Sequence, residues 1–164
     1  MQNIYSTTLI CPYNDQNCSE ATLSLDPDLY GVLASSQDYD ELLYVWKEWR
    51  DKTGRLMKND YAEYVKYMNK AAEIAGTDDM GELWRSSFEE DNFVENMKQL
   101  WEQLKPFYGE LHKYVRRKLM EIYGDKMDAE NPNIPAHLLG NMWAQSWVNL
   151  YERTKPFETD LDIT

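Results

Sequence analysis

One long run of regularly spaced apolar residues, between positions 91 and 123, constrains the fold more than any other feature of the sequence. The apolar residues recur at intervals of three and four, which places them on one face of an α-helix. They are Phe93, Met97, Leu100, Trp101, Leu104, Tyr108, Leu111, Val115, Leu119 and Ile122. The spacing predicts a helix over 91–123 that ends at Gly124, and Pro106 predicts a kink near residues 102–106.

Shorter periodic stretches follow the same rule in the rest of the chain. Helices are predicted over 38–56, from Asn59 to Gly76, over 79–88, and from Pro135 to about Tyr151. Residues 1–36 carry turn formers without a period, and Ser24 and Asp28 indicate a capped turn before Leu29. No alternating β pattern is present, so the sequence predicts an all-α fold of about five helices without an internal domain boundary.

Composition excludes several classes of function. The formal net charge of −12 argues against nucleic acid, because phosphate binding needs a clustered basic face, and it disfavours an anionic membrane surface. The acidity serves solubility or attracts basic peptides. No apolar run reaches the roughly 18 residues of a membrane span. No signal peptide follows Met1, so either the protein is cytosolic or its true start lies upstream.

The two cysteines, Cys11 and Cys18, lie in a polar, turn-rich stretch. They are too few and too widely spaced for a zinc ribbon. A short-loop disulfide in an oxidising compartment fits them, as does a pair of free surface thiols in the cytosol. Asn17-Cys18-Ser19 is also a formal glycosylation sequon.

Few residues carry recognisable chemistry by themselves. The histidines, His112 and His137, do not form a His-Glu-x-x-His motif, so the chain cannot assemble a zincin site alone. His112 borders the apolar stripe of the long helix and is expected to be a hydrogen-bonded structural residue. The basic triplet 116–118 suits the negative end of that helix dipole, or a binding patch.

The predicted last helix carries amides at every fourth position. Asn141, Gln145 and Asn149 would line one face of it, flanked by Trp143 and Trp147. Carboxamides beside aromatic rings can donate hydrogen bonds to a ligand carboxylate. The alternative is an amide-rich face that contacts other helices or water.

The same segment also carries a resemblance. Residues 134–147 read Ile-Pro-Ala-His-Leu-Leu-Gly-Asn-Met-Trp-Ala-Gln-Ser-Trp, which resembles the signature of angiotensin-converting enzymes and their invertebrate relatives. The stretches 39–55, 84–86 and 114–119 follow in family order. The resemblance implies an all-α segment from the N-terminal half of a zincin-type peptidyl-dipeptidase. Such enzymes are secreted zinc- and chloride-dependent hydrolases that remove dipeptides from peptide C-termini.

The resemblance implies one partial peptidase domain over 1–164. It comprises a disulfide-containing loop 1–36, a helical part 37–152 and an acidic tail 153–164, with the downstream zinc-binding half absent. No catalytic residue and no zinc ligand falls within the chain. The peptide substrate and the missing C-terminal half of the domain are the implied partners, and the chain alone is expected to be inactive.

Only a few site residues carry over by resemblance. Gln145 matches the glutamine that helps to hold the substrate carboxylate, and Arg50 matches an arginine of one chloride site. Phe88 replaces the tyrosine that commonly serves the second chloride site. Cys11 and Cys18 match the first short disulfide, which favours secretion, and Asn17 lies where relatives are often glycosylated.

Three interpretations of the chain follow. It is part of a complete peptidyl-dipeptidase, or a truncated, catalytically dead relative that binds peptides or proteins, or a helical product whose resemblance has no functional consequence. Without a downstream half, the aromatic faces of residues 39–49 and 138–150 are expected to be partly exposed, so the isolated chain should be helical but prone to association.

Overall fold

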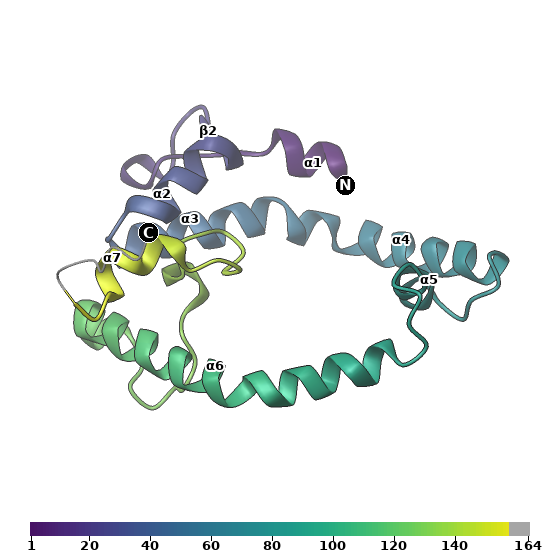
Figure 1. The fold of residues 1–164 in the computed structure, drawn as a ribbon. Helices are drawn as coiled ribbons and strands as arrows, with labels where there is room; N and C mark the ends of the chain where they lie inside the picture. Colours follow the sequence, from purple (N-terminus) through teal and green to yellow (C-terminus); the bar gives the residue numbers. More distant parts are fainter. Residues whose placement is uncertain (158–164) are drawn as a thin grey trace, which may run out of the picture.

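The computed structural model describes residues 1–157, and helices make up most of them. The principal helices are α3 (Tyr39–Lys52), α4 (Gly54–Ile74), α5 (Met80–Ser86) and α6 (Phe93–Tyr123). Helices α3 and α4 follow one another along one side of the molecule, α5 turns the chain at the far end, and α6 returns along the other side (Figure 1). The prediction of an all-α fold is confirmed.

Local signals place most of the helix ends where the sequence predicts them. The Asp38 carboxylate caps α3 by accepting hydrogen bonds from the N–H groups of Asp40 and Glu41, at 2.8 and 3.3 Å. Asp79 does the same for α5. Gly76 and Gly124 follow α4 and α6 with φ of +89° and +53°, a conformation that favours glycine. Helix α6 remains continuous through Pro106.

The break between the first two long helices differs from the prediction. Helix α3 ends at Lys52 and α4 begins at Gly54, whereas the sequence predicted an end at 56 and a start at 59. Thr53 turns the backbone between them, and its hydroxyl donates to the Trp49 carbonyl over 2.7 Å. One non-helical residue leaves the apolar spacing nearly unchanged, so periodicity could not reveal this break.

The first 36 residues contain several short elements that the spacing of apolar residues did not predict. Helix α1 (Gln2–Thr7) leads into strand β1 (Leu9–Ile10), which pairs antiparallel with β2 (Leu23–Ser24). Between them lies the single turn η1 (Tyr13–Asp15), and a distorted helical turn η2 (Leu25–Leu29) leads into α2 (Tyr30–Ser35). The expected capped turn before Leu29 is present, because Asp28 accepts from both the N–H and the hydroxyl of Ser24.

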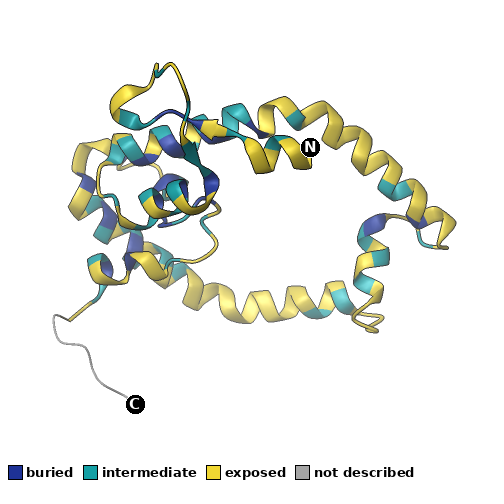
Figure 2. Ribbon diagram, turned by 90° about the horizontal axis from the view of Figure 1, so that it is seen from above, coloured by how far each residue is buried: buried dark blue, intermediate teal, exposed yellow. Residues whose placement is uncertain are grey.

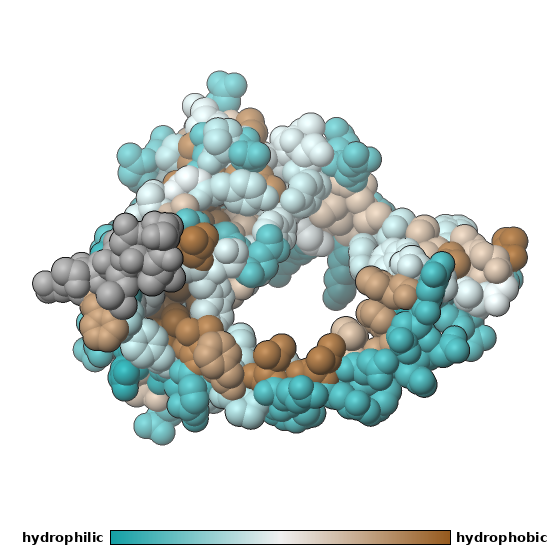
Figure 3. All heavy atoms as spheres, in the orientation of Figure 1, coloured by the Kyte–Doolittle hydropathy of each residue, from teal (hydrophilic) through white to brown (hydrophobic). Residues whose placement is uncertain are grey.

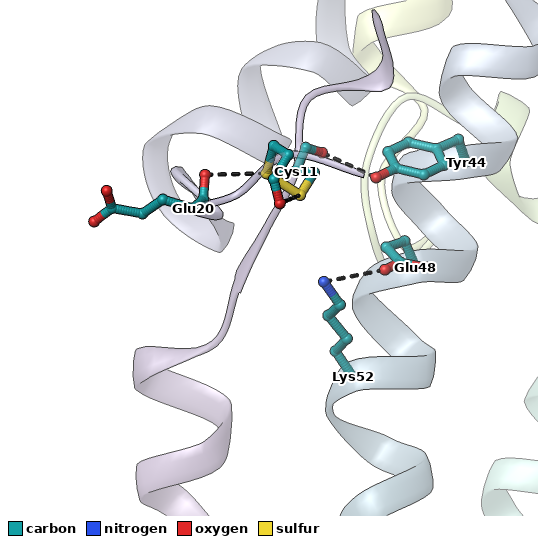
Figure 4. The surroundings of a disulfide bond; sticks show 6 residues. Cys11, Glu20, Tyr44, Glu48 and Lys52 are labelled. Atoms are coloured by element: carbon teal, nitrogen blue, oxygen red, sulfur yellow. Dashed lines mark hydrogen bonds and ion pairs between the residues drawn. A yellow bond between two sulfur atoms is a disulfide. The ribbon is translucent and has the colours of Figure 1, made fainter. Parts of the chain in front are cut away.

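Cys11 and Cys18 form a disulfide, with their Cα atoms 5.8 Å apart (Figure 4). The Cys18 sulfur lies 3.0 Å from the carbonyl oxygen of Glu20, a contact without a hydrogen bond because a disulfide sulfur carries no proton. The Tyr44 hydroxyl donates to the Cys11 carbonyl over 3.1 Å. This bond ties the disulfide loop to α3.

The apolar core gathers at one end of the molecule (Figure 2). It joins β1, η2, α2, α3, the C-terminal part of α6 and the segment that follows it. Its members are Ile10, Leu25, Leu29, Leu33, Leu42, Val45, Trp49, Val115, Leu119, Tyr123, Met127, Leu138, Leu139, Met142 and Leu150. Helix α4 and the first half of α6 extend away from this core and are largely exposed.

The chain after α6 consists of single turns: η3 (Gly124–Lys126), η4 (Ala136–Leu138), η5 (Val148–Leu150) and α7 (Tyr151–Thr154). The predicted helix from Pro135 to Tyr151 is therefore wrong. Gly140 and Ala144 have φ of +81° and +54°, values that an α-helix cannot contain. Residues 158–164 of the predicted acidic tail lie outside the described residues.

Arg116 has a role that neither interpretation of the basic triplet, the helix dipole or a binding patch, included. Its guanidinium donates to the carbonyls of Asp128, Ala129 and Asn131 at 2.6–3.0 Å. The side chain thus binds the loop 125–134 to α6 and directs the chain back towards the core.

Candidate functional site

The segment that carries Gln145 forms an exposed turn between two buried anchors. Met142 has no exposed surface, and Leu150 is 1% exposed. Between them the chain rises to the surface, where Gln145 is exposed. The Gln145 carboxamide makes no hydrogen bond within residues 1–157, and the residue is exposed to solvent. The turn therefore presents a polar group from a backbone held at both sides.

The three amides do not share a face as predicted. The Oδ1 atom of Asn141 accepts from the Trp143 N–H over 2.8 Å. The Asn149 carboxamide donates to the Gly140 carbonyl over 2.8 Å. Gln145 and Asn149 are both exposed, but of the three amides only Gln145 makes no side-chain hydrogen bond within residues 1–157. The prediction that the three amides line one face of a helix is therefore wrong, because the segment is not helical and each amide has a different environment.

Gly140 is a position where a side chain would not fit. Its φ of +81° is rarely adopted by L-residues, and a Cβ there would lie 3.0 Å from Asn149 Cβ. We expect Gly140→Ala to lower the free energy of unfolding by about 1–3 kcal/mol, measured by urea denaturation. Gly109→Ala, in open space on α6, is the matched control and should not destabilise the chain. Equal effects of the two changes would contradict this account.

Arg50 binds the turn from the α3 side. Its guanidinium donates to both the carbonyl oxygen and the sulfur of Met142, and to the Trp46 carbonyl over 3.1 Å. It also lies 3.8 Å from the centre of the Trp46 ring, a cation–π distance. Burial lowers the pKa of Arg50 from its usual value. Arg50 is thus largely engaged by the protein itself.

Aromatic rings support the turn on both sides. Trp143 packs edge-on against Trp49 and stacks with Tyr5, at centroid distances of 5.4 and 6.3 Å. Trp147 lies 6.0 Å from Tyr108 of α6. The predicted partial exposure of the aromatic faces of 39–49 and 138–150 is present only in part. Trp143 is 38% exposed, whereas Trp49, against which it packs, is 3% exposed.

Many large apolar side chains are exposed on α4, α5 and α6, among them Leu56, Ile74 and Trp84. Figure 3 shows apolar residues along the side of α6 that borders a central opening in the molecule. The large apolar residues of α6 that are at least 40% exposed are Val94, Met97, Leu100, Trp101, Leu104, Phe107, Tyr108, Leu111 and Ile122. A separate apolar cavity of about 560 Å³ lies between α1 and α4, and no predicted site residue lines it.

The histidines do not fit a zinc site. His137 is 5% exposed, with its ring edge-on to Tyr39 at 4.6 Å, and burial lowers its pKa to about 4. His112 is half-buried beside Tyr108 and Trp147. In the described part of the chain, no three His, Cys, Asp or Glu side chains lie close enough together to hold a metal ion. Zinc binding by residues 1–157 alone is therefore not supported by the donor set.

The remaining predicted positions lie apart from Gln145. Phe88 follows α5, is 64% exposed and stacks on Phe93 at 4.6 Å. Asn17 is exposed on the disulfide loop. Within residues 1–157, none of the helices has the length and apolarity needed to cross a lipid bilayer.

Sequence reasoning missed Arg50 as a partner of Met142, and Asn141 as the residue that shapes the turn. The pair Gly140-Asn141 carried a usable signal, because both residues favour turns and neither suits the middle of a helix. No local signal could have joined Arg50 to Met142, which lies 92 residues away.

Comparison with known proteins gives a single family. The family model described as "Angiotensin-converting enzyme" matches residues 1–164. Angiotensin-converting enzyme of Rattus norvegicus is 45% identical over 157 residues, which are 96% of this chain and 12% of that protein. The enzyme of Theromyzon tessulatum is 44% identical over the whole chain and 27% of its own length. Angiotensin-converting enzyme-like protein Ace3 of Mus musculus is 44% identical over 22% of its length. The chain therefore spans between about an eighth and a quarter of these relatives.

Proposed function

The chain belongs to the angiotensin-converting enzyme family, and on that premise we propose that it forms part of the substrate-binding wall of a zinc peptidyl-dipeptidase. An enzyme that releases C-terminal dipeptides has to recognise the free carboxylate of its peptide substrate. In this chain, Gln145 would provide that recognition. The substrate class, peptides with a free C-terminus, follows from the same premise.

The exposed Gln145 carboxamide is the observation that carries this proposal. Its N–H groups can donate to a carboxylate, and a hydrogen bond to a charged partner is worth more than one between neutral groups. The buried Met142 and the flanking aromatic residues hold the turn in place. Holding the backbone still reduces the entropy lost when substrate binds.

Zinc and the catalytic base belong, in this proposal, to the downstream half of the complete domain. The family is generally zinc-dependent, and zinc held by that half would supply the activation of a water molecule for attack on the peptide bond. The residues of this chain contribute binding and orientation. Arg50 would serve a chloride site, and Phe88 brings no hydroxyl to a second one. The disulfide and the exposed Asn17 support a secreted, glycosylated product.

The test changes Gln145 in the complete protein that contains this sequence. We expect Gln145→Leu to raise the KM for a peptide with a free C-terminus by about 10- to 100-fold, the loss of a hydrogen bond to a charged group. The KM for the same peptide with a C-terminal amide should change little. Gln103→Leu, an exposed glutamine on α6, is the matched control. Equal effects on both peptides would contradict the proposed role.

The alternative function is a catalytically dead relative that binds peptides or proteins, and the exposed apolar face of α6 favours it. The intact mass of the deglycosylated native product separates the two. A mass several times 19.5 kDa supports a complete peptidase, and a mass near 19.5 kDa supports the binding module. Zinc-dependent release of dipeptides by the pure 164-residue chain would contradict the proposed division of labour.

A further inference from the structure

We infer that Asn141 is a positioning residue that sets the orientation of Gln145. The inference rests on the proposed role of Gln145 and goes beyond it, because it assigns a function to a second side chain that would not touch substrate. It depends on three features of the turn: the hydrogen bonds of Asn141, the unusual backbone beside Gln145, and the anchoring of Met142.

The Asn141 side chain holds the backbone on both sides of Gln145. Its Oδ1 accepts from the Trp143 N–H at 2.8 Å and, over a longer 3.4 Å, from the N–H of Gln145 itself. Its Nδ2 donates to the Ser146 carbonyl at 2.6 Å. The reverse orientation of the amide would set N–H against N–H and oxygen against oxygen. The neighbouring groups thus admit only one orientation of the carboxamide.

The backbone beside Gln145 needs such support. Ala144 has a φ of +54°, the left-handed region that a Cβ disfavours. The residues around it lack the repeating hydrogen bonds of a helix, although the Trp147 indole donates to the Ala144 carbonyl over 3.1 Å. Without the Asn141 bonds, the turn would relax towards more favourable backbone angles and carry Gln145 with it.

The residues on both sides of Asn141 are held in place, so its side chain can fix the backbone around Gln145. The next residue, Met142, is fully buried, and the Arg50 guanidinium binds its carbonyl oxygen and sulfur. On the other side, Gly140 is buried, and its carbonyl accepts from Asn149. A rigid frame therefore extends from the core through Asn141 to Gln145. Hydrogen-bond donors must be held close to their final geometry to bind substrate well.

The experiment is a double-mutant cycle in the complete protein, read as KM and kcat with a free-carboxylate peptide. Asn141→Ala is expected to raise KM about 10-fold while kcat changes less than about threefold. Asn141→Asp keeps both acceptor contacts but sets an oxygen against the Ser146 carbonyl oxygen in place of the donating Nδ2, so it should also raise KM, by about 10-fold. In the Gln145→Leu background, Asn141→Ala should add no further increase.

The outcomes separate the two proposals. If Gln145→Leu leaves KM unchanged, the proposed role of Gln145 fails, and the inference fails with it. If Gln145→Leu raises KM but Asn141→Ala does not, or adds its full effect in the double mutant, only the positioning role is overturned. An Asp variant that keeps the parent KM also overturns it, because the bond donated to Ser146 would then not matter. Should Asn141→Ala unfold the protein, Asn141→Ser, which can accept from the nearer Trp143 N–H alone, should give an intermediate KM, and an unchanged KM overturns the inference.

Discussion

Replacing Met142 with alanine is expected to lower the free energy of unfolding by about 3–4 kcal/mol, within the range measured for buried Met-to-Ala changes. Met142 is fully buried and forms part of the core between α3 and the turn. The substitution removes its apolar contacts and leaves a cavity. It also deprives the Arg50 guanidinium of the sulfur it contacts.

Urea denaturation of the purified chain, monitored by tryptophan fluorescence, measures this effect. Met97→Ala is the matched control, because it makes the same chemical change at a side chain that is 43% exposed on α6. The control substitution should lower the free energy of unfolding by less than about 1 kcal/mol. If both variants lost the same stability, Met142 would not be the anchor of the turn.

Acidification is expected to destabilise the chain through His137. Burial lowers the pKa of this histidine from 6.5 to about 4, and the carboxylate of Asp40 opposes the shift only in part. Above pH 6.5 His137 is neutral in both the folded and the unfolded chain, and its contribution to stability is complete. Between pH 6.5 and 4 the unfolded chain binds a proton that the folded chain does not. Stability should therefore fall by about 3 kcal/mol across this window.

The free energy of unfolding, measured at pH 7, 5.5 and 4, tests this expectation. His137→Phe removes the titrating group while keeping an aromatic ring against Tyr39, so its stability should fall less between pH 7 and 4. His112→Gln keeps His137, so its free energy of unfolding should fall between pH 7 and 4 by as much as that of the parent. An acid loss of the same size in the Phe variant would assign the effect to other groups, such as the many carboxylates of this acidic chain.

The long helices could be predicted from the sequence because their signals are local. Apolar spacing defined α6, and the capping residues Asp38 and Asp79 and the terminal glycines Gly76 and Gly124 marked helix ends. The family resemblance, carried by residues 134–147 and confirmed over the whole chain, identified Gln145 as the residue of interest. These properties depend on residues that are neighbours along the chain.

The conformation of the turn that presents Gln145 required the tertiary structure. Its residues have a spacing compatible with a helix, yet Gly140 and Ala144 adopt positive φ angles. Contacts with residues far away in the sequence favour this turn over a helix, because Arg50 of α3 binds Met142 and Trp143 packs on Trp49.

The sequence by itself determined the family, the helical class and the identity of the candidate binding residue, because local spacing and motif matches need no distant partner. Only the tertiary structure decided that the core lies at one end, that Trp143 packs on Trp49, and that the Asn141 side chain binds the backbone on both sides of Gln145. Burial of apolar surface between segments about 90 residues apart outweighs the weak local preference for helix in residues 135–151.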